Sequence, residues 1–471
     1  MNRRVLCFDL GASSGRAMLA EYDGSRIFLR EVHRFKNRGV PVCGALYWDI
    51  LALFGEIRTG LKKAAEQGGF ESVGIDTWGV DYGILDSQGD LIRLPVQYRD
   101  RRTSGMVERS AEMISHERLY ALTGDQIMEI NTAFQLLAEK SYVLENGAAL
   151  LNIPDLLGYF LTGVISSEES IASTTQLYDP AGRCWSEEAI AALGLPRRLF
   201  GKIVPAGSIK GALRPELCSE LGIPQVPVAA VCGHDTQCAS LAVPAQESDF
   251  IFLSSGTWSL LGTVTDEPFL SKEAMELELT NEVGYGGRIN LLKNITGLWI
   301  VQETKAFLES RGEELSFADL ERAARNEEEF SSFIDPDDPV FSSPGDMPER
   351  VRSYCQRTGQ QIPENIGQVM RAIYLGLAKK YELALEQISK LTGKTYRRIY
   401  MVGGGTKDSY LCRLTADICG LPVTAGPVEA TVMGNAAVQL LSLGAVTGAD
   451  QIPGIVRRSE ETREFSPRSA L

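Results

Sequence analysis

The stretch VLCFDLGASSGRAMLAEY, residues 5–22, opens the chain with an apolar run, a turn of small residues and a second apolar run. The first run ends at Asp9, and the residues after the turn alternate as in a strand rather than a helix. We therefore predict short strands over 4–10, 15–22 and 26–35, joined by tight turns. The turn GASSG is compatible with two chemistries, a serine nucleophile in the pattern G-x-S-x-G and a cradle for phosphate.

The phosphate interpretation fits the surrounding sequence better. A nucleophile elbow requires a helix directly after the serine and a histidine late in the chain. Here a hairpin pattern follows Gly15, and the last histidine is His234. Small residues let backbone N–H groups approach an anion, Ser13 and Ser14 add hydroxyl donors, and Arg16 adds positive charge. A tight hairpin that binds no ligand remains the alternative from this stretch alone.

The composition limits the class of protein. A chain of 471 residues exceeds one ordinary core, so two domains are expected. The net charge of −14 disfavours nucleic acid and anionic lipid as partners, and no window is apolar enough for a membrane span. Nine scattered cysteines without a C-x-x-C pattern indicate reduced thiols in the cytoplasm. The three histidines do not cluster, which disfavours a zinc or iron site.

The second half of the chain repeats the order of the first. The run VPVAAV (226–231) predicts a strand that ends in the polar turn CGHDTQ, and 249–264 predicts two more strands. Helical and strand patterns then alternate, as they do in the first half. We therefore predict an α/β fold of two related domains with mixed sheets around a central cleft. The expected boundaries are 1–244 for the first domain, 245–450 for the second and 451–471 for a loose tail.

Several motifs together resemble one known family. They are DLGASSGR (9–16), GIDTWGVDYG (74–83), GHDTQ (233–237), SSGTWSL (254–260) and VGGGT (402–406). In this order they resemble the FGGY family of carbohydrate kinases, whose two ribonuclease-H-like domains have the actin, hexokinase and Hsp70 type of fold. Further segments resemble the branch of that family that acts on L-rhamnulose, namely LREVHRF (29–35), LPVQYRDRRT (94–103), LKNITGLWIVQ (292–302) and GPVEATVMGN (426–435). The likeness covers nearly the whole chain.

The resemblance implies roles for individual residues. Contacts to the phosphates of ATP are expected from Ala12, Ser13, Ser14, Gly15 and Arg16. Further contacts to the nucleotide are expected from Thr257, Gln302 and Gly404. Contacts to the ketose are expected from Gly79, His234, Asp235, Thr236 and Asn294. Asp235 would be the catalytic base. Asp9, at the end of the first strand, is suited to hold the magnesium ion of ATP through water.

The activity that the resemblance implies is ATP-dependent phosphorylation of L-rhamnulose at its 1-hydroxyl, giving L-rhamnulose 1-phosphate in L-rhamnose catabolism. ATP and Mg²⁺ are the expected cofactors, and a monomer or small homo-oligomer in the cytoplasm is the expected form. One alternative is a kinase of another ketose or polyol, such as L-fuculose or L-xylulose. The other is a non-catalytic ATP-binding protein like actin or Hsp70.

Some of these residues have two interpretations. Asp235 is either the base or the N-cap of a helix. His234 is favoured as a neutral donor to a sugar hydroxyl, with a role as base as the alternative. Trp78 either packs in the core or contacts the sugar. Asp76 and Asp81 are either sugar-binding groups or solvated strand ends.

Overall fold

The computed structural model describes residues 2–468 and divides into two compact units. The first unit comprises Met1–Pro244, Thr265–Leu291 and Ala430–Ser459, and the second comprises Ala245–Val264, Leu292–Glu429 and Glu460–Leu471. Each unit is therefore assembled from segments that are far apart in the sequence. Both contain mixed sheets, because hairpins supply antiparallel pairs and strand–helix–strand connections supply parallel ones.

The sheet of the first unit is built around the hairpin at the start of the chain. β1 (Arg3–Leu10), β2 (Ser14–Tyr22) and β3 (Ile27–Lys36) form an antiparallel meander. β6 (Val73–Thr77) pairs parallel to β1, and β14 (Pro227–Ala229) pairs parallel to β6. The strand order is β13-β14-β6-β1-β2-β3. The three strands predicted from the opening of the chain are confirmed.

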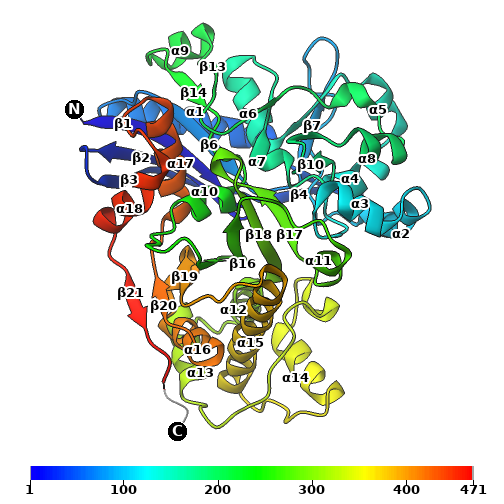
Figure 1. The fold of residues 1–471 in the computed structure, drawn as a ribbon, viewed down its shortest axis with the longest axis vertical. Helices are drawn as coiled ribbons and strands as arrows, with labels where there is room; N and C mark the ends of the chain where they lie inside the picture. Colours follow the sequence, from blue (N-terminus) through cyan, green and yellow to red (C-terminus); the bar gives the residue numbers. More distant parts are fainter. Residues whose placement is uncertain (1, 469–471) are drawn as a thin grey trace. The chain divides into compact units, whose positions relative to one another are not determined.

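Side chains alternate along these strands and divide the sheet into two faces. On one face, α1 (Ile50–Glu66) and α6 (Ile153–Thr162) bury the apolar residues of β1 and β6. On the other face lie α10 (Asp235–Leu241) and α17 (Ala430–Ser442), which pack against each other. Figure 1 shows the orange-red α17 beside the blue strands β1 and β2, although more than 400 residues separate them in the chain.

A glycine allows α10 and α17 to approach closely. A Cβ atom on Gly434 of α17 would lie 1.9 Å from the carbonyl oxygen of Cys238 in α10. The backbones of the two helices are therefore in direct contact at this point, and a larger residue does not fit. The position of α10 is consequently set by the backbone of α17.

The first unit contains the following further elements. Its other strands are β4 (Gly39–Val42), β5 (Ala45–Trp48), β7 (Tyr82–Leu85), β8 (Ala149–Asn152), β9 (Ser167–Glu168), β10 (Tyr178–Asp179), β11 (Cys184–Trp185), β12 (Ile203–Val204), β13 (Ile209–Ala212) and β17 (Thr280–Val283). Its other helices are α2 (Met106–Ala111), α3 (His116–Thr123), α4 (Thr132–Leu137), α5 (Ser141–Asn146), α7 (Glu169–Ala172), α8 (Glu187–Ala192), α9 (Pro215–Leu221), α11 (Lys272–Glu276) and α18 (Ile452–Ser459).

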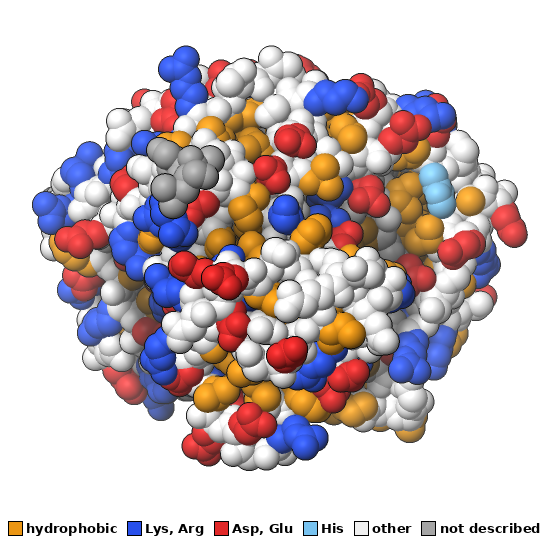
Figure 2. Space-filling view, turned by 90° about the horizontal axis from the view of Figure 1, so that it is seen from below, with side chains coloured by type: hydrophobic (Ala, Val, Ile, Leu, Met, Phe, Trp, Pro, Cys, Tyr) orange, Lys and Arg blue, Asp and Glu red, His pale blue; other side chains and the backbone are white. Residues whose placement is uncertain are grey.

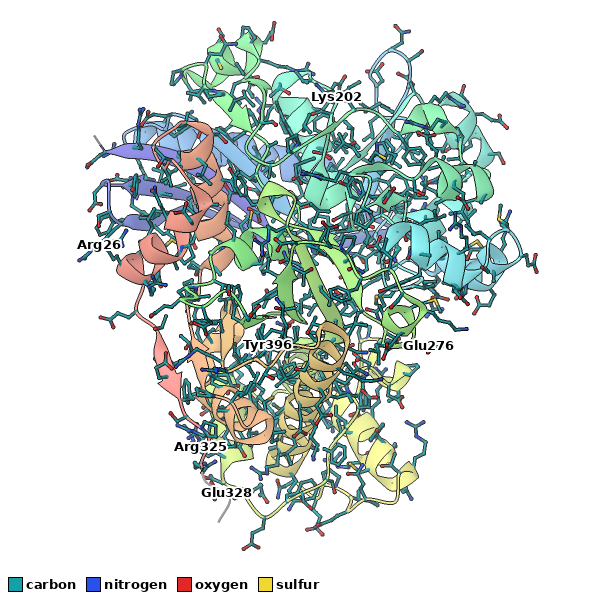
Figure 3. The ribbon with its side chains drawn as sticks, in the orientation of Figure 1. Arg26, Lys202, Glu276, Arg325, Glu328 and Tyr396 are labelled. Atoms are coloured by element: carbon teal, nitrogen blue, oxygen red, sulfur yellow. The ribbon has the colours of Figure 1, made fainter. Side chains whose placement is uncertain are left out.

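The strands of the second unit lie in the order β18-β16-β15-β19-β20-β21. These strands are β15 (Ile251–Ser255), β16 (Trp258–Thr265), β19 (Ile399–Val402), β20 (Val423–Ala425) and β21 (Arg463–Phe465), and β18 (Ile289–Thr296) enters this unit from the first. Its helices are α12 (Trp299–Ser310), α13 (Phe317–Arg325), α14 (Met347–Arg357), α15 (Ile366–Thr392) and α16 (Ser409–Cys419). The long α15 packs against α13 and α16. Arg325, labelled in Figure 3, links α13 to α16 through a hydrogen bond to Ser409 and a contact with the ring of Tyr410.

Residues 452–465 contain α18 and β21, in contrast to the loose tail predicted over 451–471, of which 469–471 lie outside the described residues. α18 buries Ile455 and Val456, and β21 pairs antiparallel with β20. Both elements are short, and a helix of two turns or a strand of three residues gives too few positions for a periodic pattern. Tertiary packing therefore stabilises elements that the local sequence does not indicate.

The surface carries charges of both signs. Figure 2 shows basic and acidic side chains interspersed over the face that it presents, with hydrophobic side chains between them. Among residues 2–468, none of the helices combines the length and hydropathy that a membrane crossing requires.

Candidate active site

Two carboxyl groups lie side by side where β1 and β6 end. In the parallel register of these strands Asp9 is opposite Asp76. Both point to the face covered by α10 and α17, because their neighbours Phe8 and Ile75 belong to the core on the opposite face. The carboxyl ends of parallel strands meet at one edge, where open α/β sheets bind their ligands. The strand register thus places two acidic groups at the edge where a ligand is expected.

Asp76 is completely buried, so it is not a solvated strand end. Its Oδ2 accepts a hydrogen bond of 2.6 Å from Asn435 Nδ2 in α17, and its Oδ1 has no partner among the described residues. Burial and the neighbouring Asp9 raise the pKa of Asp76, Asn435 lowers it, and Asp235 raises it further. Asp76 therefore has no exposed oxygen to offer a sugar.

The turn GASSG closes as a tight hairpin. The Gly11 N–H donates to the Ser14 carbonyl at 2.9 Å. Asn37, just after β3, donates from Nδ2 to the Gly11 carbonyl at 2.9 Å and from its backbone N–H to the Ser13 carbonyl at 3.0 Å. Ser13 is exposed, whereas Ala12 and Ser14 are half-buried. Asn37, which is not part of the turn, therefore fixes the turn through two of its carbonyl groups, while the small residues of the turn stay accessible.

Gly15 and Arg16, which were also predicted to bind phosphate, differ from the accessible residues of the turn because both make close contacts within the sheet. A Cβ on Gly15 would lie 2.3 Å from the ring of Phe35, so this position requires glycine for packing against β3. Arg16 is the cross-strand partner of Asp9 and donates to Asp9 Oδ2 from Nε at 3.0 Å and from Nη2 at 2.8 Å. Asp9 and Arg16 thus form an ion pair beside the turn.

The loop after β14 is fixed to the end of β6. The Thr77 N–H donates to the Gly233 carbonyl at 2.8 Å, and the Gly233 N–H donates to Glu168 Oε2 at 2.8 Å. A Cβ on Gly233 would lie about 3 Å from Glu168, Ile171 and Pro154, so a side chain there would displace the loop. Burial raises the pKa of Glu168 to about 7. The residues that follow Gly233 are therefore held at the same edge as Asp9 and Asp76.

Asp235 is the first residue of α10, and the N-cap position belongs to His234. No side-chain cap bond is formed there, so the interpretation of Asp235 as a helix cap is wrong. Its side chain is 32% exposed and accepts a hydrogen bond of 3.2 Å from the buried Thr236 hydroxyl. Burial raises the pKa of Asp235, the imidazole of His234 lowers it, and Asp9 raises it. The carboxyl group is thus partly open to a ligand and close enough to Asp9 to be affected by its charge.

His234 lies between two carboxylates. Its Nδ1 is 2.7 Å from Glu282 Oε2, and its Nε2 is 3.4 Å from Asp235 Oδ1. Burial alone would lower the pKa of His234, but Glu282, Asp235 and Glu168 outweigh burial and raise this pKa to about 9. At neutral pH this raised pKa favours a charged imidazolium over the neutral donor that the sequence suggested. The sequence could not show this, because Glu282 lies 48 residues further along the chain.

The turn between β6 and β7 is an internal network. Trp48 Nε1 and Trp78 Nε1 donate to Asp81 Oδ2 at 2.6 and 3.0 Å, and Gln135 Nε2 donates to Asp81 Oδ1 at 2.9 Å. The two indole rings lie 4.3 Å apart. Asp81 is buried and its oxygens are bound by protein donors, so it organises the turn and is not a solvated strand end. Burial raises the pKa of Asp81 to about 6 despite these donors.

Gly79 lies at the tip of this turn and is half-buried. A Cβ there would be 3.3 Å from Thr174, which is a close contact. The next residue, Val80, has φ of 66°, a conformation that is unfavourable for a β-branched side chain. Its N–H is held by Thr174 and its carbonyl by Thr132. Such imposed strain is concentrated at functional sites, which supports a role for this turn.

The second unit brings three predicted nucleotide-binding residues to one edge of its sheet. β15 and β19 are parallel, with Ser254 opposite Val402, so the turns that follow them lie at the same edge. Thr257 follows β15, and its hydroxyl is 3.4 Å from Gln302 Oε1 on α12. Gly404 follows β19, is exposed, and has open space where a Cβ would be. Asn294, predicted to bind the ketose, is half-buried on β18.

Comparison with known proteins identifies the family. Residues 4–242 match the N-terminal domain of the FGGY family of carbohydrate kinases, and residues 251–443 match its C-terminal domain. The chain belongs to the FGGY family. This kinase is 39% identical to a rhamnulokinase of Bacteroides thetaiotaomicron over 99% of this chain and 96% of the relative. It is also 39% identical to a rhamnulokinase of Enterococcus faecalis, over 94% of this chain and 90% of the relative.

Solved structures show the same fold. The xylulose kinase from Lactobacillus acidophilus has a TM-score of 0.80 at 15% identity, over 99% of this chain and 94% of its own. Plasmodium falciparum glycerol kinase with ADP has a TM-score of 0.78 at 16% identity, with the same coverage. The prediction of an α/β protein with two domains of the actin and hexokinase type is confirmed, and this FGGY kinase is an enzyme that acts on a carbohydrate.

Within the first unit, the structure gathers Asp9, His234 and Asp235 at one edge. Sequence reasoning missed three groups that support them, which are Asn435, Glu168 and Glu282. The segment GPVEATVMGN contains Asn435 and was recognised as a motif, but the partner of this residue was not. Glu168 and Glu282 carry no local signal, because their role arises from tertiary contacts with Gly233 and His234.

Proposed function

We propose that this protein transfers the γ-phosphoryl group of ATP to the 1-hydroxyl of L-rhamnulose. The identity to rhamnulokinases over nearly the full length of both chains supports the choice of sugar. One observation in the structure carries the mechanism, namely the carboxyl group of Asp235, which caps no helix and is partly exposed beside the buried His234. We place the reaction in the cytoplasm, where ATP is available.

In this mechanism Asp235 is the general base. As the oxygen of the sugar hydroxyl forms its bond to the γ-phosphorus, the bond from that phosphorus to the β,γ-bridging oxygen breaks, and ADP leaves with the electron pair. The hydroxyl proton passes to the Asp235 carboxylate and later to water. Modest basicity is sufficient, because the proton leaves late in a loose phosphoryl transfer. The positive charge on His234 keeps a larger fraction of Asp235 ionised, since it lowers the pKa of that carboxyl.

The phosphates of ATP are assigned to the turn Ala12–Arg16. Its accessible small residues allow close approach of an anion. Thr257, Gln302 and Gly404 are assigned to the nucleotide on the second unit, where they share one sheet edge. Gly79 and Asn294 are assigned to the ketose together with His234 and Thr236.

Asp9 fits a magnesium ion. Its side chain is 12% exposed at the strand end, and Arg16 donates two hydrogen bonds to its Oδ2. Among the described residues no three His, Cys, Asp or Glu side chains form a metal cage. Magnesium does not need one, because it keeps several waters and binds through one or two carboxylates and the phosphates of a nucleotide. When bound, the ion supplies charge neutralisation for the transferred phosphoryl group.

A panel of ketoses tests the proposal. ADP release would be measured by a coupled assay with L-rhamnulose, L-fuculose and L-xylulose, and without sugar. We expect the highest kcat/KM with L-rhamnulose. A higher kcat/KM with another ketose would assign that sugar instead, and ATP hydrolysis that does not depend on sugar would favour an actin-like or Hsp70-like protein.

The base is tested in the same assay with Asp235→Asn. We expect a loss of kcat of about 10²–10⁴-fold with ATP binding unchanged. Asp266→Asn is a suitable control, because the Asp266 side chain is 81% exposed. Near-normal turnover of Asp235→Asn would exclude this residue as the base.

A further inference from the structure

We propose that Glu282 is a positioning residue for phosphoryl transfer, because its carboxylate fixes the imidazole of His234 so that the second ring nitrogen faces Asp235. This inference rests on the proposed function. It adds to that function a third member of the site, from a strand that none of the sequence motifs includes.

The geometry forms a chain that runs from the interior toward solvent. Glu282 on β17 has a side chain that is 6% exposed, His234 is 11% exposed and Asp235 is 32% exposed. Glu282 Oε2 lies 2.7 Å from His234 Nδ1, and Asp235 Oδ1 lies 3.4 Å from Nε2. One imidazole thus connects a buried carboxylate to the carboxyl group that is open to a ligand. A carboxylate bound to Nδ1 fixes both the orientation and the protonation of a histidine ring.

Glu282 is itself held in place from several elements. It accepts a second hydrogen bond from Gln237 Nε2, and Gln237 Oε1 in turn accepts one from Asn290. Asn290 also donates to Ser240 at 2.9 Å. The next residue on β17, Val283, donates its N–H to Ser173 at 2.9 Å. Glu282 therefore connects β17 to the N-cap and the first turn of α10, and its carboxylate has little freedom to move.

The charges around His234 determine what the loss of Glu282 would do. The groups that face the imidazole are Glu282 from β17, Asp235 from α10 and Glu168 before α7, all of them carboxyl groups. Asp125 is close enough to Glu282 for the charge of Glu282 to raise the pKa of Asp125. Removal of the Glu282 charge takes away the largest favourable contribution to the imidazolium, so the pKa of His234 falls. The pKa of Asp235 then rises, because the neutral ring no longer favours its ionised form.

The test uses Glu282→Gln, which keeps the shape of the side chain and removes its charge. NMR titration of the histidine rings reports the effect without any assay of activity, because the chain contains only His33, His116 and His234. We expect the titration midpoint of His234 to fall by about one pH unit or more, a tenfold change in its protonation equilibrium. Glu282→Asp keeps the charge, and we expect it to restore part of this shift.

The kinetic readout is the pH profile of kcat/KM for the ketose. In Glu282→Gln we expect the acidic limb to move to higher pH, so that the loss relative to the native enzyme is about tenfold greater at acidic than at alkaline pH. Glu169→Gln is the matched control. Its side chain is 5% exposed on the neighbouring α7, but it pairs with Arg183 and Tyr178 instead of His234. We expect it to leave both readouts unchanged, apart from any loss of stability.

An unchanged midpoint of His234 and an unchanged acidic limb in Glu282→Gln would overturn the inference. Equal shifts in Glu169→Gln would also overturn it, since they would show a general effect of lost packing. Failure of the proposed function is a separate result, because it would be seen as absence of ketose-dependent ADP release in the native enzyme, whatever the histidine titration shows.

Discussion

Replacement of Gly434 by alanine should both destabilise the protein and impair catalysis. The new Cβ would lie 1.9 Å from the Cys238 carbonyl oxygen and 2.5 Å from its carbonyl carbon. Even a separation of 3.0 Å requires the two helices to move apart by about 1 Å, and the atom in the way is backbone, which cannot rotate aside. Overpacking of this kind costs about 1–3 kcal/mol of folding free energy, and we expect the upper end of that range.

The catalytic effect follows from the same displacement. Cys238 lies one helical turn after Asp235 in α10, so a shift of α10 moves the proposed base. A misplacement of about 1 Å reduces turnover by roughly 10²-fold. Urea denaturation followed by circular dichroism would measure the stability, and the coupled ADP assay would measure kcat.

Gly55→Ala provides the matched control. Gly55 is exposed in the middle of α1, with open space where a Cβ would be. Alanine is favoured over glycine in a helix by about 1 kcal/mol, so this variant should be slightly more stable and fully active. If Gly434→Ala were as stable and as active as Gly55→Ala, the close contact between α10 and α17 would be refuted.

Three further predictions concern single groups. Asp81 has a folded-state pKa of about 6, above its ordinary value, so the folded protein holds this proton more tightly than the unfolded chain and the stability it contributes is lost as pH rises from about 4 to 6. Asp81→Asn removes this loss, so its free energy of unfolding, relative to that of the native protein, should rise by about 3 kcal/mol over that window in urea titrations. Lys210→Met leaves the buried Asp155 without its ion-pair partner and should cost about 3–5 kcal/mol at pH 8 but less at pH 5, where that carboxyl is more readily protonated; equal losses at both pH values would contradict the ion pair. Thr257→Val removes the hydroxyl next to Gln302 and should raise KM for ATP about tenfold while KM for the ketose stays unchanged, and a change in the ketose KM alone would refute the assignment.

The sequence was sufficient for elements with a clear pattern. The opening hairpin was predicted because it combines alternating apolar residues with small turn residues between its strands. α18 and β21 were missed because they are too short to show a period. The discontinuous composition of the first unit was also not predictable, because the packing of α17 against β1 is a contact across the whole chain.

The candidate site also contains some residues that the sequence predicts and others that it does not. Asp9 and Asp235 stand out because they interrupt apolar runs next to small-residue turns. The charge of His234 could not be predicted from the sequence, because it depends on Glu282. The buried hydrogen bonds of Asp81 could not be predicted either, because they depend on Trp48 and Gln135. Local patterns therefore identify the residues that meet a ligand, whereas the groups that set their charge come from distant segments.

The late position of α17 has a consequence for biosynthesis. Asn435 and Gln439 reach Asp76 on β6, the Leu6 carbonyl on β1, and Ser72 just before β6. A ribosome must therefore translate nearly the whole message before these strands receive their covering helix. Until then the nascent protein exposes the face that carries Asp9 and Asp76, and a prematurely terminated product ending before Ala430 would be a natural client for chaperones and proteases.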